Sequence, residues 1–192
     1  MRTRHSFLLL SFLALLDTAG GCTATEEKPA QKEKEVKGMA TFQVTSAVFK
    51  EGEVIPKRHS CDGEDLSPPL AWVKTPEGTK SVALLCEDPD APRGMWVHWV
   101  LWGLPADSTS LPEGIPPDAL LANRAKQGKN DWGRIGYGGP CPPPGPAHRY
   151  FFKFYALDTD LALKPGATRK DLLRAIEGHV LAEGQLMGRY KR

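Results

Sequence analysis

Two segments of the chain combine ionisable side chains with a rigid backbone. In the first, the sequence DPDAP (residues 88–92) is followed by Trp96 and His98 within an apolar run. In the second, a proline-rich stretch that begins at Gly139 leads to His148. Proline fixes the backbone φ angle and glycine lets a backbone approach a ligand closely, so loops of this composition hold their neighbours in place.

Together these residues have the chemistry of an anion pocket. An imidazole has a donor N–H in either protonation state, so His98 and His148 can each donate to a phosphate or carboxylate oxygen. The hydroxyl of Tyr150 and open backbone amides at Gly138 and Gly139 would add donors. The residues alone leave a structural interpretation open, because a histidine in an apolar strand is often a satisfied core residue and Asp-Pro-Asp is often a turn.

The composition indicates one globular domain. The chain has 192 residues, a net charge of +2, 25% charged residues and 41% hydrophobic residues. These are ordinary globular values, and the near-neutral charge argues against general nucleic-acid binding, which needs a clustered basic surface. The 17 prolines and 19 glycines favour a fold with many turns over a helical bundle.

The N-terminus has the pattern of a lipoprotein signal peptide. Arg2 and Arg4 precede an apolar run (residues 7–16) that is too short to span a bilayer, and small residues then lead to Cys22. We expect residues 1–21 to be removed and Cys22 to be lipidated. The exported protein would then be anchored to the cell envelope, at the periplasmic face of the outer membrane in a Gram-negative host. The alternative is an ordinary signal peptide that is cut nearby, because Ala19 replaces the usual leucine.

The next segment predicts a tether. Residues 23–38 contain four lysines, four glutamates and almost no apolar side chains. Such a stretch buries too little surface to offset the entropy of ordering it. We therefore divide the chain into a signal peptide (residues 1–21), a lipidated Cys22 with a disordered tether (residues 22–38) and one folded domain (residues 39–192).

Four segments have the pattern of β-strands, and turn-rich sequences separate them. Two are continuous apolar runs, as expected for strands that are buried on both faces. The four segments are residues 41–49, 81–86, 96–102 and 149–157. The sequence therefore predicts a mainly β fold, an antiparallel β-sandwich with Pro/Gly-rich loops.

One helix is predicted to close the chain. Thr168 can cap it, and Asp171 lies in its first turn, near the positive end of the helix dipole. Apolar residues then recur at helical spacing as far as Leu181, and Gly184 can end the helix. We expect this C-terminal helix to pack on the sandwich.

From Phe42 to Tyr190 the chain resembles the phosphatidylethanolamine-binding protein family, in the bacterial and archaeal branch often called Raf kinase inhibitor-like. The resemblance depends on DPDAP, the His98-Trp99 pair, Gly-Pro at residues 139–140 and His-Arg-Tyr at residues 148–150. Shorter stretches also resemble that branch, namely residues 61–63, 67–70, 130–133 and 155–158.

The resemblance implies which residues bind the ligand. Asp88 and Asp90 would orient the imidazoles or accept hydrogen bonds from the ligand, whereas Arg149 would make structural pairs. The full set of implied ligand-binding residues is Asp88, Asp90, Trp96, His98, Gly139, Pro140, His148 and Tyr150.

The resemblance also implies two covalent features. The Ala91–Pro92 bond would be cis, in the tight turn of the ligand loop. Three cysteines remain in the domain, and an exported protein can form disulfides. If any pair is bridged, we expect Cys61 with Cys141, because both lie at turn-rich segments that the branch shares, and Cys86 would stay reduced.

The function implied is binding rather than catalysis. We expect a small anionic ligand, a phospholipid head group or a phosphorylated partner, and inhibition of a kinase or protease is a further option. No cofactor and no metal are predicted, since neither Cys-x-x-Cys nor a short His-x-His spacing occurs. The alternatives are a small hydrolase that uses the Asp/His cluster, with Cys141 as its one candidate nucleophile, a metal site of two His and two Asp, and a purely structural protein.

Overall fold

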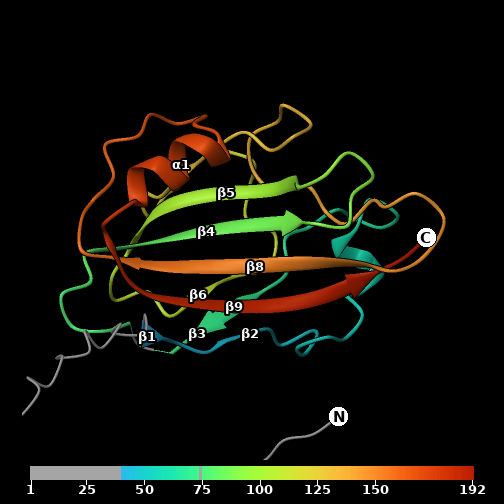
Figure 1. Ribbon diagram of the computed structural model, residues 1–192, viewed down its shortest axis with the longest axis horizontal. Helices are drawn as coiled ribbons and strands as arrows, with labels where there is room; N and C mark the ends of the chain where they lie inside the picture. The colour runs from blue at the N-terminus through green and yellow to red at the C-terminus, as the bar shows by residue number, and fades with distance from the viewer. Residues whose placement is uncertain (1–39, 74) are drawn as a thin grey trace, which may run out of the picture. The chain divides into compact units, whose positions relative to one another are not determined.

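The computed structural model describes residues 40–73 and 75–192. The predicted signal peptide (1–21), the lipidated Cys22 and the tether (22–38) lie outside the described residues. Within the described part, no helix is long and apolar enough to cross a membrane. The domain shown in Figure 1 is mainly β, with two sheets and one short α-helix, as the sequence predicted.

The larger sheet has six strands and the smaller has three. Every pairing is antiparallel except that of β1 with β9. In spatial order, the larger sheet consists of β1 (Ala40–Thr41), β9 (Val180–Tyr190), β8 (His148–Leu157), β4 (Ser81–Asp88), β5 (Trp96–Pro105) and β7 (Lys126–Gln127). The smaller sheet consists of β2 (Val44–Thr45), β3 (Leu70–Trp72) and β6 (Ser110–Leu111). A 3-10 turn, η1 (Lys57–His59), precedes β3.

The central strands β4 and β5 of the larger sheet are buried on both faces, which explains their continuous apolar runs. In β4, Val82 and Leu84 face a core shared with the smaller sheet, where Trp72 lies 4.9 Å from Phe154 between ring centroids. The alternate residue Leu85 faces a second core beneath α1 (Arg169–Ile176). Figure 1 shows α1 lying against β5. Successive strand residues point to opposite faces, so both faces of β4 must be apolar.

The central strands bring three strand ends together. Because β4 runs antiparallel to both β5 and β8, the end of β4 lies beside the beginnings of its two neighbours. Asp88 ends β4, Trp96 begins β5 and His148 begins β8. Residues 60 positions apart in sequence, such as Asp88 and His148, therefore meet at one edge of the sheet.

A β-bulge places His98 at this same edge. Val97 and Trp99 pair with the consecutive residues Glu87 and Cys86, so His98 is left without a partner in β4. An extra residue in one strand re-aims a side chain. The centroid of the His98 ring lies 5.0 Å from that of the Tyr150 ring. Tyr150 lies in the core shared with the smaller sheet, as does Cys86 of β4.

The C-terminal helix is only partly as predicted. Thr168 caps it and forms a capping box with Asp171, which confirms the predicted start. Its end was placed wrongly, because α1 stops at Ile176 and Gly178 adopts a positive φ of 80°. The residues expected to continue the helix instead form β9, whose backbone hydrogen bonds go to β8.

The first predicted strand was also too long. Residues 41–49 do not form one strand, because β1 pairs with β9 while β2 pairs with β3 of the other sheet. The chain crosses from one layer to the other between Thr41 and Val44. The strands predicted at residues 81–86, 96–102 and 149–157 are confirmed as β4, β5 and β8.

A buried carboxylate attaches α1 to the central strands. Glu87 of β4 is 1% exposed, and it accepts hydrogen bonds from Lys153 Nζ at 2.8 Å and from Arg169 Nε. Burial opposes ionisation of Glu87, but the two cations outweigh it and hold the pKa of this carboxyl below its usual range. Since Asp88 is the next residue, this cluster also fixes the end of β4.

Replacing Glu87 with Gln should therefore destabilise the domain. The change leaves Lys153 and Arg169 without their shared anion, and removing one member of a buried ion pair costs about 3–5 kcal/mol when the remaining charge is fully buried. Both cations are about a third exposed, so we expect about 2–3 kcal/mol in urea unfolding. Glu183→Gln on the exposed side of β9 is the matched control. Equal stability of the two variants would contradict the proposed role of Glu87.

Candidate functional site

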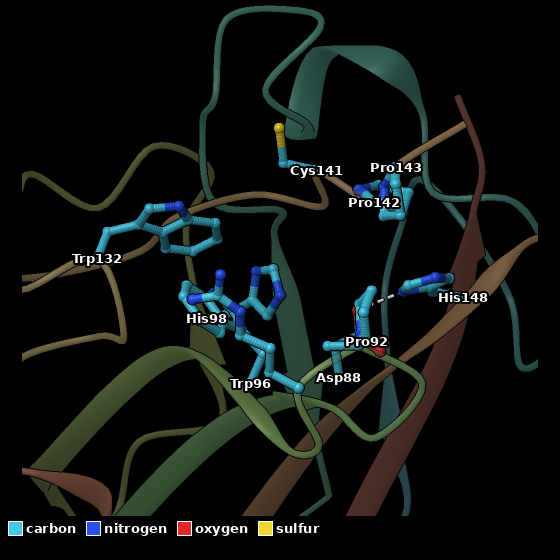
Figure 2. A pocket seen from close by; sticks show the side chains of 11 residues that line it. Asp88, Pro92, Trp96, His98, Trp132, Cys141, Pro142, Pro143 and His148 are labelled. Atoms are coloured by element: carbon cyan, nitrogen blue, oxygen red, sulfur yellow. Dashed lines mark hydrogen bonds and ion pairs between the residues drawn. The ribbon is translucent and has the colours of Figure 1, made fainter. Parts of the chain in front are cut away.

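A cavity of about 250 Å³ lies where the ends of β4, β5 and β8 meet. Figure 2 shows its lining side chains, with Asp88 and His148 facing one another across a hydrogen bond. Four of the sequence-predicted site residues line it, namely Asp88, Trp96, His98 and His148. The other lining residues are Ala91, Pro92, Arg93, Trp132, Cys141, Pro142 and Pro143.

His148 is oriented by Asp88. Its Nδ1 lies 2.8 Å from Asp88 Oδ2, and both side chains are less than a tenth exposed. An ionised carboxylate only accepts hydrogen bonds, so Nδ1 carries the proton and Nε2 has no intramolecular partner among the described residues. As the resemblance implied, Asp88 orients an imidazole.

His98 is held in the same way by a backbone carbonyl. Its Nδ1–H donates to the Gly138 carbonyl at 2.6 Å, while the Gly138 N–H donates to the His98 carbonyl at 2.9 Å. Burial lowers the pKa of His98 below its usual value, although Asp88 and the hydrogen bond to Gly138 act in the opposite direction. Desolvation of the buried ring therefore outweighs the charge of the nearby aspartate.

Tyr150 and Trp96 carry buried donors. Tyr150 is fully buried behind His98, and its hydroxyl has no hydrogen-bond partner among the described residues. The Trp96 Nε1–H is likewise buried and unpartnered within the described part. Burial, reinforced by the Asp88 carboxylate, raises the pKa of Tyr150, so its hydroxyl stays protonated and able to donate.

Asp90 does not orient an imidazole. Its carboxylate accepts hydrogen bonds from the backbone N–H, Nε and Nη2 of Arg149 at 2.7–2.9 Å. These bonds lower the pKa of Asp90 to about 2. The structural pairing expected for Arg149 is confirmed, and Asp90 fixes the start of β8 from outside the lining of the cavity.

Gly139 and Pro140 are buried beside the cavity but do not line it. The expectation of open backbone amides is wrong, because the Gly138 N–H donates to the His98 carbonyl and the Gly139 N–H donates to Asp65 Oδ1 at 2.6 Å. A Cβ at residue 139 would lie 2.4 Å from the His59 carbonyl oxygen. Glycine is therefore required here for close backbone packing.

One covalent prediction is confirmed and the other is wrong. Cys61 and Cys141 form a disulfide with a Cα separation of 5.4 Å, and Cys86 is a buried free thiol. All described peptide bonds are trans, including Ala91–Pro92, so the predicted cis bond is absent. The turn at residues 89–94 is instead closed by a trans backbone, in which the Gly94 N–H donates to the Ala91 carbonyl.

Seven lining residues were not among the predicted site residues, and the two with the largest side chains are Trp132 and Arg93. Trp132 packs edge-to-face on Trp96 at 5.3 Å and on His98 at 5.0 Å between centroids. Its position is set by Asp131, which exchanges hydrogen bonds with the backbone of Val97. An aromatic residue inside a polar loop was the available signal. Arg93 follows DPDAP directly, so the cation was visible in the ligand loop itself.

The described residues contain no group of three or more His, Cys, Asp or Glu side chains placed to hold a metal ion. The Asp and His side chains of the cavity pair with one another or with the backbone, as shown above. The arrangement is therefore one of fixed hydrogen-bonding groups around a small space.

The depressed pKa of His98 predicts acid sensitivity in a defined window. The unfolded state takes up a proton near pH 6.5 whereas the folded state resists it, so the stability contribution is complete above about 6.5 and is lost as the pH falls below it. Urea unfolding at pH 7.5 and 5.5 should show a larger loss for the wild type than for His98→Asn. The asparagine amide keeps the donor to Gly138. Asp90, with a pKa of about 2, titrates below this window. Identical losses would rule out His98 as the source.

The comparisons with known proteins agree with this geometry. The family model described as "Phosphatidylethanolamine-binding protein" matches residues 45–191. A UPF0098 protein of Methanothermobacter thermautotrophicus is 54% identical over 144 residues, which cover 75% of this chain and 95% of the relative. A UPF0098 protein of Aquifex aeolicus is 49% identical over 157 residues, covering 81% and 91%.

Solved structures lead to the same family. A phosphatidylethanolamine-binding protein homologue from Chlamydia trachomatis matches with a TM-score of 0.73 and 41% identity, covering 79% of this chain and 98% of that one. The structure of E. coli YbcL, described as a member of the mammalian PEBP family, matches with a TM-score of 0.74 and 37% identity, covering 80% and 99%. The chain therefore belongs to the phosphatidylethanolamine-binding protein family.

Proposed function

We propose that the protein is a non-catalytic binding protein whose cavity holds the phosphoryl or carboxylate group of a small ligand, a lipid head group or a phosphorylated partner. One observation carries the proposal. Two buried imidazoles, His98 and His148, line the same small cavity, and each is fixed through Nδ1 by an acceptor of the protein. Their Nε2 atoms are left to interact with a ligand.

The depressed pKa of His98 favours a ligand that can both donate and accept hydrogen bonds. A neutral imidazole bonded through Nδ1–H offers a lone pair at Nε2, so it accepts a hydrogen bond from a protonated phosphoryl oxygen. The Arg93 guanidinium and the unpartnered Trp96 Nε1–H line the cavity and supply N–H groups for the other oxygens, whereas Tyr150 lies outside its lining. A phosphate that keeps one proton satisfies both kinds of group.

The size and lining of the cavity suit a head group with an apolar neighbour. About 250 Å³ is small for a drug-sized ligand, for which pockets of about 300–1,000 Å³ are usual. Pro92, Pro142 and Trp132 add apolar surface next to the polar residues. The family's description as phosphatidylethanolamine-binding supports a lipid head group as one occupant.

Several features support binding without catalysis. Cys141, the one nucleophile considered from the sequence, is bonded to Cys61. Burial raises the pKa of the Cys86 thiol, which lies in the core. No serine, threonine or lysine lines the cavity. The Asp88–His148 pair has the geometry of a base and its orienting acid, so hydrolysis of a phosphate ester by water is the alternative to exclude.

Calorimetric titration of inorganic phosphate at pH 7.5 tests the proposal. His98→Asn and His148→Asn keep an N–H at the Nδ1 position but remove Nε2, so each should lower affinity about 10- to 100-fold, the scale of a hydrogen bond to a charged group. Sulfate has no proton to donate at this pH, so it should bind more weakly than phosphate and respond less to His98→Asn.

The matched control is His179→Asn. His179 is paired with Asp158 at 2.8 Å in the same manner as His148 with Asp88, but at the opposite end of β8. This variant should bind phosphate like the wild type. Equal affinity in all four proteins would contradict the assignment of the cavity, and turnover of a chromogenic phosphate ester that is lost in His148→Asn would favour the hydrolase.

We further propose that the protein is exported and anchored through Cys22, for which the N-terminal sequence pattern is the support. Metabolic labelling with an alkyne fatty acid should label the wild type and not Cys22→Ser. Cell fractionation should place the wild type with the membranes. Processed wild-type protein that is unlabelled and in the soluble fraction would contradict the anchor, and would favour cleavage by an ordinary signal peptidase.

A further inference from the structure

One wall of the cavity is closed by the disulfide. Cys141, Pro142 and Pro143 line the cavity, and Cys141 is bonded to Cys61, which lies 80 residues earlier. Figure 2 shows Cys141 at the rim, next to the two prolines and above His98. Both half-cystines are exposed, so the bond is accessible to a thiol in solution.

The disulfide replaces hydrogen bonds that this wall lacks. The residues just before Cys141 are hydrogen-bonded, since Pro140 O accepts from the Cys61 N–H at 3.1 Å and the Gly139 N–H donates to Asp65. From residue 141 to residue 147, the backbone makes no hydrogen bond to any described residue. Four of these seven residues are prolines, which have no N–H to donate. Between Pro140 and β8, the wall is therefore attached by the covalent bond and by the packing of the buried Pro142.

The opposite wall is held differently. Asp88, Trp96, His98 and His148 lie on strands of the larger sheet, and Trp132 is held by the backbone bonds of Asp131 to Val97. Breaking the disulfide would leave these contacts intact. The change would therefore be confined to Cys61, to residues 139–147 and to the part of the cavity that they close.

We propose that the Cys61–Cys141 disulfide is a thiol-exchange site whose redox state sets the affinity of the cavity for its ligand. This inference rests on the proposed function. The reductant is a dithiol. One of its thiolates attacks a sulfur of the disulfide, the S–S bond breaks, and a mixed disulfide forms with one cysteine while the other leaves as a thiolate and takes up a proton. The second thiol then resolves the mixed disulfide, so Cys61 and Cys141 gain two electrons and two protons and the dithiol becomes a disulfide.

Ligand and disulfide would then be thermodynamically coupled. If the closed wall binds the ligand better than the released wall, the bound ligand must favour the oxidised form by the same factor. A wall that is correctly placed only a tenth of the time lowers the apparent affinity about 10-fold. Reduction should thus weaken binding without abolishing the fold, and ligand should slow reduction.

Phosphate titrations of oxidised and dithiothreitol-reduced wild type, and of a Cys61→Ser/Cys141→Ser variant with and without reductant, test the proposal. We expect at least about 10-fold weaker binding for the reduced wild type and for the variant. Reoxidation should restore the wild type only, and reductant should not affect the variant. That last comparison controls for the buried Cys86. Saturating phosphate should also slow the reduction of the wild type, followed by mass spectrometry of alkylated thiols.

Hydrogen exchange separates failure of this inference from failure of the proposed function. Reduction should accelerate exchange at the hydrogen-bonded amides of Cys61 and Gly139, which lie at this wall, while β4, β8 and β9 stay protected. If the oxidised protein binds no phosphate, the proposed function fails, and the exchange pattern still decides whether the wall is released. Phosphate affinity that is equal in both redox states, unchanged exchange at the wall, or loss of protection throughout the sheet would each overturn the redox inference.

Discussion

Because β4 is paired antiparallel with both β5 and β8, the end of one central strand lies beside the beginnings of two others. The cavity described above depends on that arrangement. The strand pairing places Asp88 next to His148, and the loops at these strand ends only have to cover the site. The apolar residues that bury both faces of β4 keep the three strands together, so the core that stabilises the fold also fixes the cavity.

The two imidazoles are held from opposite sides by groups of different kinds. His148 is bonded to a carboxylate of the neighbouring strand, and His98 to a carbonyl in the loop before Gly139. The first arrangement places a negative charge against the ring, whereas the second offers only a dipole in a desolvated position. Burial consequently lowers the pKa of His98 even though Asp88 is close. Two histidines of one cavity thus have distinct electrostatic surroundings.

The sequence predicted those parts of the structure that local patterns encode. The runs at residues 81–86, 96–102 and 149–157 are strands. The helix cap at Thr168 can be recognised from residues 168–171 alone. The last strand was missed because two of its inward positions are Gly184 and Gly188, which hide the alternation of β9 and leave a helical spacing more obvious. The partners of β1 and β2 lie in different sheets, which no local pattern reveals.

The resemblance to a known family predicted residues of the site better than it predicted their roles. Four of the eight predicted ligand-binding residues line the cavity, and the pairing of Cys61 with Cys141 is confirmed. The glycine N–H groups are already hydrogen-bonded, Asp90 pairs with Arg149, and the bond before Pro92 is trans. These roles were not predicted because each depends on how separate loops pack against one another. Trp132 enters the cavity for the same reason, through the bonds of Asp131 to Val97.

The bulge at His98 separates the lining of the cavity from sheet formation. Since residue 98 has no partner in β4, its side chain contributes to the cavity without belonging to the register of the strands. Its backbone carbonyl is engaged by Gly138 whatever the side chain is. A substitution at this position would therefore change the lining of the cavity and leave the register of the central strands in place.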